Sequence, residues 1–148
     1  LQATRAAVEE GIVAGGGVSF MAASSVLDSV QTSDADEKIG VEIIRKALEA
    51  PVRTIANNAG FEGSVVVEKI KALPTGQGLD SASGQYGDMI EMGVLDPVKV
   101  TRTTLQNAAS VASLILITEA TVSEMPKDTT IEESISRAAA QGGQGSMY

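Results

Sequence analysis

Apolar residues recur at intervals of three to four positions over much of the chain, which is the spacing of amphipathic helices. The first ten residues are good helix formers, and residues 18–30 continue a helical pattern after a break. The break is the run Gly15-Gly16-Gly17, which predicts a loop because each glycine has a large backbone entropy to lose in a helix. The chain is therefore predicted to begin with two helices joined by a glycine turn.

A longer helical pattern follows a polar loop. Its start is predicted to be a capping box, with Ser33 as the cap and Asp36 in place of the preferred glutamate. Pro51 lies inside the pattern and is expected to kink or divide the helix, which residues 57–60 end. A shorter helix is predicted over residues 64–73. Its inward face is predicted to consist of Val66, Val67 and Ile70.

The second half of the chain contains further signals for turns and for the ends of helices and strands. Residues 74–87 contain four glycines and predict a loop or a short hairpin. Asp96-Pro97 predicts the start of a long helix, because Asp is a favoured N-cap and proline is favoured at the first helical position. Residues 120–125 alternate enough to predict a short strand ended by Pro126. The predicted fold class is mainly α, with a short hairpin and a carboxy-terminal strand.

The amino-acid composition excludes several classes of function. Apolar residues make up 43% of the chain and aromatic residues only 3%, so the core is predicted to consist of aliphatic side chains between closely packed helices. The net charge of -8 argues against a nucleic-acid partner, which requires a basic surface. The chain has no Cys and no His, so Ser–His and Cys–His hydrolases and thiolate metal sites are excluded. No apolar run approaches the roughly 20 residues that span a membrane, and no catalytic or metal-binding residue is predicted.

Three short segments have both a structural and a functional interpretation. The glycine run precedes a helix, where an anion is favoured, but it matches neither the Walker loop nor GxGxxG, and a plain turn also explains it. Asp96 either caps a helix or accepts hydrogen bonds from ribose hydroxyls, and the two roles are compatible. The polar run 80–83 either forms a turn or faces an adenine edge. The residues alone leave these alternatives open.

Several separate motifs, in order along residues 1–127, together resemble the group I (GroEL-type) chaperonin family. Thr118-Glu119 lies beyond the last of them, as it does in the family. Agreement of several motifs at the family's spacing is far more specific than any one of them. The motifs are Ala3–Gly17, Glu49–Pro51, Tyr86–Ile90, Met92–Pro97, Lys99–Arg102 and Ala108–Ala112.

The resemblance implies an ATP-driven protein-folding machine of two homo-oligomeric rings that acts on unfolded client proteins with a co-chaperonin. Residues 1–127 would be the carboxy-terminal part of its equatorial ATP-binding domain, and residues 128–148 a flexible tail. The implied cofactor is ATP with Mg, and the implied compartment is the bacterial cytoplasm or an organelle matrix. No nucleic-acid or membrane partner is expected.

The resemblance also implies which residues bind the nucleotide. Gly16 matches the glycine whose backbone lies against the nucleotide, and Gly15 is its neighbour. Asp96 matches the carboxylate that holds the ribose, with Val94 packing near the base. Asp80-Ser81-Ala82 falls where the family commonly has Asn-Ala-Ala beside the adenine, so two of those three residues differ here.

Other implied features concern assembly and missing parts. Arg53 and Glu62 match positions of contact between the two rings, and residues 120–125 resemble a strand that pairs with a neighbouring subunit. The family's phosphate-binding Gly-Asp-Gly-Thr-Thr loop and its catalytic aspartate have no counterpart in the chain. The chain by itself is therefore expected to show no significant ATPase activity. The alternative function is a non-catalytic helical assembly or interaction module that binds no nucleotide.

Overall fold

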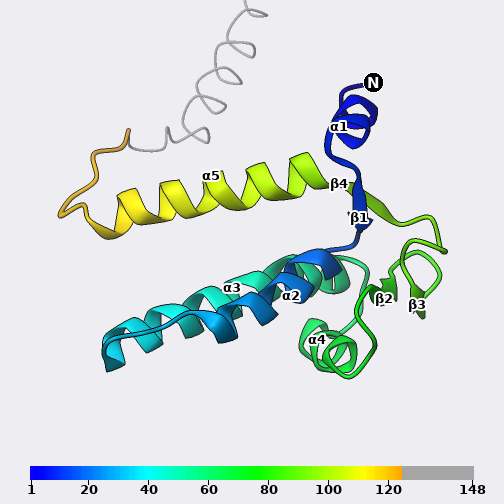
Figure 1. Ribbon diagram of the computed structural model, residues 1–148, viewed down its shortest axis with the longest axis horizontal. Coiled ribbons are helices and arrows are strands. Elements are labelled where there is room, and N and C mark those ends of the chain that lie inside the picture. Colours follow the sequence, from blue (N-terminus) through cyan, green and yellow to red (C-terminus); the bar gives the residue numbers. More distant parts are fainter. Residues whose placement is uncertain (125–148) are drawn as a thin grey trace, which may run out of the picture. The chain divides into compact units, whose positions relative to one another are not determined.

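The computed structural model describes residues 1–124, and the predicted tail, residues 128–148, lies outside the described residues. The chain divides into two compact units, Leu1–Ala112 and Ser113–Tyr148. Helices dominate the described part, which confirms the mainly α prediction (Figure 1). The helical segments are α1 (Gln2–Glu10), α2 (Val18–Ala23), the 3-10 segment η1 (Ser24–Ser29), α3 (Ala35–Asn58), α4 (Gly63–Lys71) and α5 (Val98–Leu116). The strands are β1 (Ile12–Ala14), β2 (Gln77–Asp80), β3 (Gln85–Asp88) and β4 (Leu95–Pro97).

The short strand β1 pairs with β4, which is far away in the sequence. The pair is antiparallel, with Val13 opposite Asp96, and the Val98 N–H donates to the Gly11 carbonyl at 3.1 Å. The prediction that Asp96 caps a helix is therefore wrong. Residues 95–97 are held extended by their partner strand, so helical conformation begins only at Val98.

The first helix is also tied to the start of α5 by charge. The Arg102 guanidinium donates to the Glu10 carboxylate at 2.6 Å, and Lys99 forms an ion pair with Glu9. The hydrogen bond from Arg102 lowers the pKa of Glu10. These pairs are exposed to solvent, so they orient α1 more than they stabilise it.

The capping box of α3 lies one residue later than predicted. Asp34 is the N-cap, and its carboxylate accepts the Glu37 N–H at 2.8 Å. The Glu37 carboxylate in turn accepts the Ser33 N–H at 2.6 Å, and this bond lowers the pKa of Glu37. Asp36 is one methylene shorter than glutamate, which favours Glu37 as the residue that reaches back along the chain.

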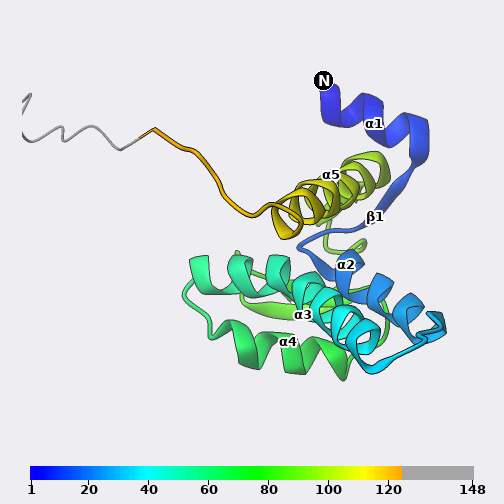
Figure 2. The same ribbon diagram turned by 90° about the vertical axis from the view of Figure 1, so that its left-hand side faces the viewer.

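Pro51 does not divide α3, which runs without a break to Asn58. The helix is buried on both sides of the proline, at Leu48, Val52 and Ala56, so tertiary packing offsets the lost backbone hydrogen bond. This face packs against α4, which lies alongside α3 (Figure 2). The α4 residues predicted to point inward are all buried, and they form one core cluster with Val52, Ala56 and Leu79.

Strands β2 and β3 form an antiparallel hairpin, which confirms the predicted hairpin, and Leu79 lies opposite Tyr86. A second small core cluster consists of Ala14, Val18 and Met89, with Val94 packed against it. Met89 has no exposed surface and is therefore a core residue. Both clusters are aliphatic apart from the half-buried Tyr86 at the edge of the first.

The strand predicted at residues 120–125 does not form in the described part of that range, residues 120–124, and Met125 lies outside the described residues. A strand requires a partner that satisfies its backbone groups. Among residues 1–124, no helix is long and apolar enough to cross a membrane.

Candidate functional site

The glycine turn adopts backbone angles that other residues avoid. Gly16 has φ 66° and Gly17 has φ 83°, both in the left-handed region that glycine enters without steric cost. Gly17 is the N-cap of α2, which has only six residues before the chain tightens into η1. So short a helix contributes little dipole at its amino end, and the turn is therefore not a strong anion site.

The turn lies directly against β4. The Gly15 N–H donates to the Val94 carbonyl at 2.9 Å, which extends the β1–β4 ladder by one residue. A methyl group on Gly15 would lie 3.0 Å from that carbonyl oxygen. The close contact between the two backbones is possible because position 15 has no side chain.

Gly16 is surrounded by segments from three parts of the chain. A methyl group on Gly16 would lie 2.9 Å from the Met89 Cε, 3.9 Å from the Val94 Cγ1 and 4.0 Å from the Leu79 carbonyl oxygen. The backbone of Gly16 thus lies between the residue that precedes β4 and the end of β2. Met89 forms the buried floor beneath it.

Asp96 lies two residues beyond Val94 and is half-buried. Side chains two apart on an extended strand lie on the same face, so Asp96 and Val94 are on one face of this segment. The ladder therefore brings two distant segments that carry predicted site residues side by side, with Gly15 and Gly16 at Val94 and with Asp96 opposite Val13.

The predicted adenine-side residues lie in the turn of the β2–β3 hairpin. The Asp80 carboxylate accepts the Ala82 N–H at 3.0 Å and the Ser83 hydroxyl at 2.5 Å, and these bonds lower the pKa of Asp80, the Ser83 hydroxyl most. Asp80 directly follows Leu79, the residue whose carbonyl is close to Gly16. Ser81 and Ala82 continue into the turn, so the hairpin brings its first strand, and not its tip, against the glycine turn.

The two predicted inter-ring residues lie together at the corner between α3 and α4. Arg53 donates to the Ser64 hydroxyl at 2.7 Å and to the Glu49 carboxylate at 3.0 Å, while Glu62 is the N-cap of α4 and accepts the Ser64 N–H at 3.2 Å. The Glu49 side chain is only 14% exposed and also pairs with Lys71 at 2.9 Å. Lys71 first and then Arg53 lower the pKa of Glu49.

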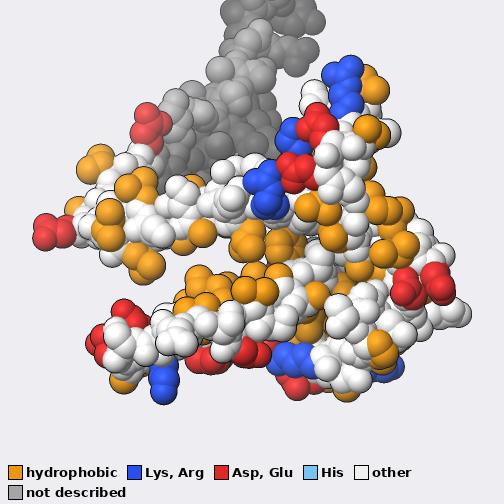
Figure 3. Space-filling view, viewed as in Figure 1, with side chains coloured by type: hydrophobic (Ala, Val, Ile, Leu, Met, Phe, Trp, Pro, Cys, Tyr) orange, Lys and Arg blue, Asp and Glu red, His pale blue; other side chains and the backbone are white. Residues whose placement is uncertain are grey.

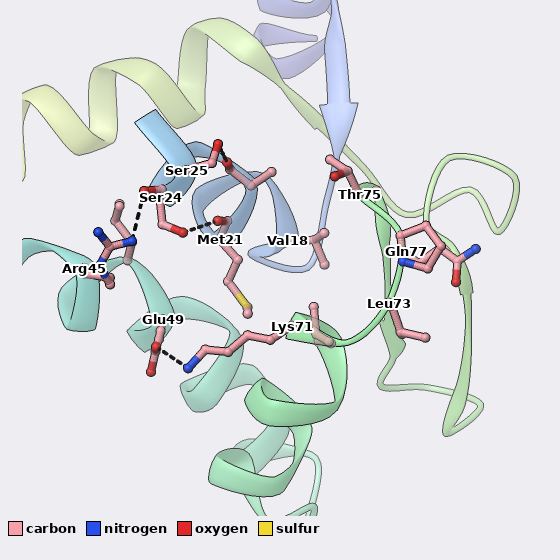
Figure 4. Close-up of a pocket in the computed structure, with 15 residues that line it drawn as sticks. Val18, Met21, Ser24, Ser25, Arg45, Glu49, Lys71, Leu73, Thr75 and Gln77 are labelled. Atoms are coloured by element: carbon pink, nitrogen blue, oxygen red, sulfur yellow. Dashed lines mark hydrogen bonds and ion pairs between the residues drawn. The ribbon is translucent and has the colours of Figure 1, made fainter. Parts of the chain in front are cut away.

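A cavity of about 470 Å³ lies elsewhere, between α2, α3 and the segment that joins α4 to β2 (Figure 4). It contains none of the predicted nucleotide-binding residues. Its cations are paired within the chain, Arg45 with Asp28 at 2.8 Å and Lys71 with Glu49 at 2.9 Å. Both cations are thus already bonded to carboxylates, and neither is free to select an anionic ligand.

Sequence reasoning did not find strand β1 or the part that Leu79 plays beside Gly16. The β-branched pair Ile12-Val13 after Gly11 was the available signal for the strand, but a strand of three residues has too short a pattern to recognise alone. Leu79 is an apolar residue flanked by Gly78 and Asp80. Nothing in the neighbouring sequence indicates which residue its carbonyl group faces.

A profile of the TCP-1/cpn60 chaperonin family matches residues 1–126. The chain is similar to a solved group III chaperonin in the open state, with 31% sequence identity and a TM-score of 0.69. That match covers 79% of this chain and 25% of the other, so the chain spans about a quarter of that chaperonin's length. Because the family profile covers most of its residues, the chain belongs to the TCP-1/cpn60 chaperonin family.

Proposed function

We propose that this chain forms the base- and ribose-binding side of the ATP site of a group I chaperonin subunit, together with part of its ring-assembly surface. The observation that carries the proposal is the meeting of the glycine turn with Val94 at the end of the β1–β4 ladder, in which Asp96 lies opposite Val13. Two segments far apart in the sequence are brought side by side by this pairing. A nucleotide that lies along these segments contacts both at once.

Each of these residues has a chemical role in this proposal. The missing side chain at Gly16 leaves the space that the Met89 side chain fills, and the half-buried Gly16 backbone is proposed to lie against the ligand on its open side. Val94 offers an apolar surface to the base, and the Asp96 carboxylate accepts hydrogen bonds from the two ribose hydroxyls. Asp80, Ser81 and Ala82 offer polar groups to the adenine edge from the hairpin.

The phosphates and their metal ion are expected to be held mainly by other residues. Mg²⁺ is usually bound by one or two carboxylates together with phosphate oxygens and water. Among residues 1–124, no group of three His, Cys, Asp or Glu side chains converges. Asp96 is assigned to the ribose, so this chain orients the nucleoside while Mg²⁺ neutralises the phosphates when bound. Phosphate release by the purified chain above an Asp96→Ala control would contradict this division of roles.

Ring assembly is proposed to use the corner between α3 and α4. Arg53 and Glu62 lie on it together and carry opposite charges. In a two-fold symmetric contact between rings, Arg53 of one ring can face Glu62 of the other. Family membership also leads us to propose that the intact protein acts on unfolded client proteins with a co-chaperonin. The proposed compartment is the bacterial cytoplasm or an organelle matrix.

The test is calorimetric titration of the chain with Mg-ATP, carried out in parallel on Asp96→Ala and on Asp36→Ala. Asp36 is an exposed aspartate in the first turn of α3, so it provides the same chemical change away from the site. We expect binding heat from the unmodified chain and from Asp36→Ala, and a loss of at least tenfold in affinity for Asp96→Ala. Equal binding by all three proteins would refute the role of Asp96.

The second candidate function is a helical assembly module that binds no nucleotide. Large apolar side chains are exposed along α3, at Ile39, Ile43 and Ile44, and along α5, at Val100 and Val111 (Figure 3). Exposed apolar patches of this kind mark interaction surfaces. Concentration-dependent self-association in sedimentation, with no ATP heat in any of the proteins, would favour this module over the nucleotide site.

A further inference from the structure

A cation–π contact joins α4 to the β2–β3 hairpin. The Lys69 ammonium lies 3.6 Å from the centroid of the Tyr86 ring. Lys69 is an exposed residue in the last turn of α4, and Tyr86 is a half-buried residue of β3. The contact therefore connects a helix of the main core to the outer strand of the hairpin.

The two strands of the hairpin are held in different ways. Strand β2 is anchored from within, because Leu79 is buried in the same cluster as Val67 and Ile70 of α4. Strand β3 has no fully buried residue, and Tyr86 is its contact with that cluster. The ammonium of Lys69 over the ring adds an attachment for the outer strand.

The attachment is connected to the candidate site through one cross-strand pair. Tyr86 lies directly opposite Leu79 in the ladder, and the Leu79 carbonyl is close to Gly16. A shift of β3 against α4 would therefore pass through the β2–β3 ladder to the strand that lies near the glycine turn. Asp80, which follows Leu79, moves with the same strand.

We propose that Lys69 is a positioning residue that holds the β2–β3 hairpin against α4 through the Tyr86 ring and thereby keeps Leu79 and Asp80 aligned with the glycine turn. The inference rests on the proposed nucleotide site for its effect on affinity. The clamp itself is a property of α4 and the hairpin alone. An exposed cation–π contact changes an equilibrium by about two- to fivefold, which sets the size of the expected effects.

The variants separate the clamp from other roles of the two residues. Lys69→Met removes the charge and keeps a long apolar side chain, whereas Lys69→Arg keeps a cation that can stack on the ring. A cation in the last turn of a helix also interacts with the helix dipole. The double-mutant cycle of Lys69→Met with Tyr86→Leu removes that contribution, because only the pairwise term remains in the cycle.

Two measurements test the inference on the whole chain. The first is amide hydrogen exchange, for which we expect residues 77–88 to exchange about two- to fivefold faster in Lys69→Met and to return to the original rate in Lys69→Arg. The second is the affinity for adenosine and for ATP, for which we expect the same two- to fivefold weakening with both ligands in Lys69→Met. Adenosine is included because the hairpin is proposed to face the base, so the loss does not require the phosphates.

The outcomes are distinct. Unchanged exchange of residues 77–88 in Lys69→Met overturns the clamp. Faster exchange with unchanged affinity for both ligands, in a chain that binds them, overturns the positioning role. If the unmodified chain binds neither ligand, the proposed function fails and the effect on affinity fails with it, while the exchange result still decides the clamp.

Discussion

Replacement of Gly17 by alanine tests whether the glycine turn is held in place by α3. Gly17 has φ 83°, and a methyl group at this position would lie 2.8 Å from the Val52 backbone nitrogen and 3.1 Å from the Pro51 Cβ. The nearest obstacle is main chain in the middle of a long helix. It cannot move aside as the end of a flexible side chain would.

Two costs add in Gly17→Ala. An L-residue in the left-handed region loses about 1 to 2 kcal/mol. Overpacking against a well-packed core costs about 1 to 3 kcal/mol more. The free energy of unfolding is therefore expected to fall by about 2 to 5 kcal/mol, a large part of the 5 to 15 kcal/mol that is typical of a domain.

Gly60→Ala is the matched control. Gly60 also has a positive φ, 85°, but a methyl group there meets no atom within 4 Å. It is expected to lose only the conformational cost of about 1 to 2 kcal/mol. Urea unfolding followed by circular dichroism measures both variants, and the midpoint of Gly17→Ala should be lower by an amount on the order of 1 M. Equal midpoints for the two variants would show that the turn does not press against α3.

Two further predictions concern the core and its charges. Glu49→Gln is expected to lower the free energy of unfolding at pH 7 by about 1 to 3 kcal/mol, because the carboxylate accepts bonds from both Lys71 and Arg53. Since these cations place the folded pKa of Glu49 below its ordinary value of 4.5, this stabilisation is present above pH 4.5 and is lost as the pH falls through the folded value. The unfolding free energies of the two proteins should therefore converge in acid, and a constant difference down to pH 2 would contradict the assignment. Met89→Ala should cost about 2 to 5 kcal/mol in urea unfolding because its side chain is fully buried, whereas the half-buried Met92→Ala should cost less.

Local pattern was sufficient where an element depends on residues close to it in the sequence. The inward face predicted for the helix at residues 64–73 is the buried face of α4. The glycines of residues 74–87 predicted a loop or a short hairpin, and the hairpin forms, with Gly84 in its turn at φ 73°. Each of these elements is determined within about ten residues, so a single sequence contains the information.

Local rules failed where a distant segment competes for the same backbone. Asp96-Pro97 predicted the start of a long helix, and α5 does begin at the next residue, Val98, but pairing with β1 keeps Asp96 extended and prevents it from capping the helix. Pro51 is a residue type that usually interrupts a helix, yet the buried residues on both sides of it keep α3 continuous. Residues 120–124 are a different case. They have the alternation of apolar and polar residues that is typical of a strand, but no strand forms there.

The amino-acid sequence by itself therefore determined the main helices, the glycine turn, the aliphatic core and, through its motifs, the chaperonin family. Only the tertiary structure decided that β1 pairs with β4 and that Leu79 lies beside Gly16. The same pairing brings the segment of Gly15 and Gly16 alongside the segment of Val94 and Asp96. The physical reason is the range of the interactions. A helix or a turn satisfies its backbone groups within a few residues, whereas a strand depends on a partner whose position no local pattern contains.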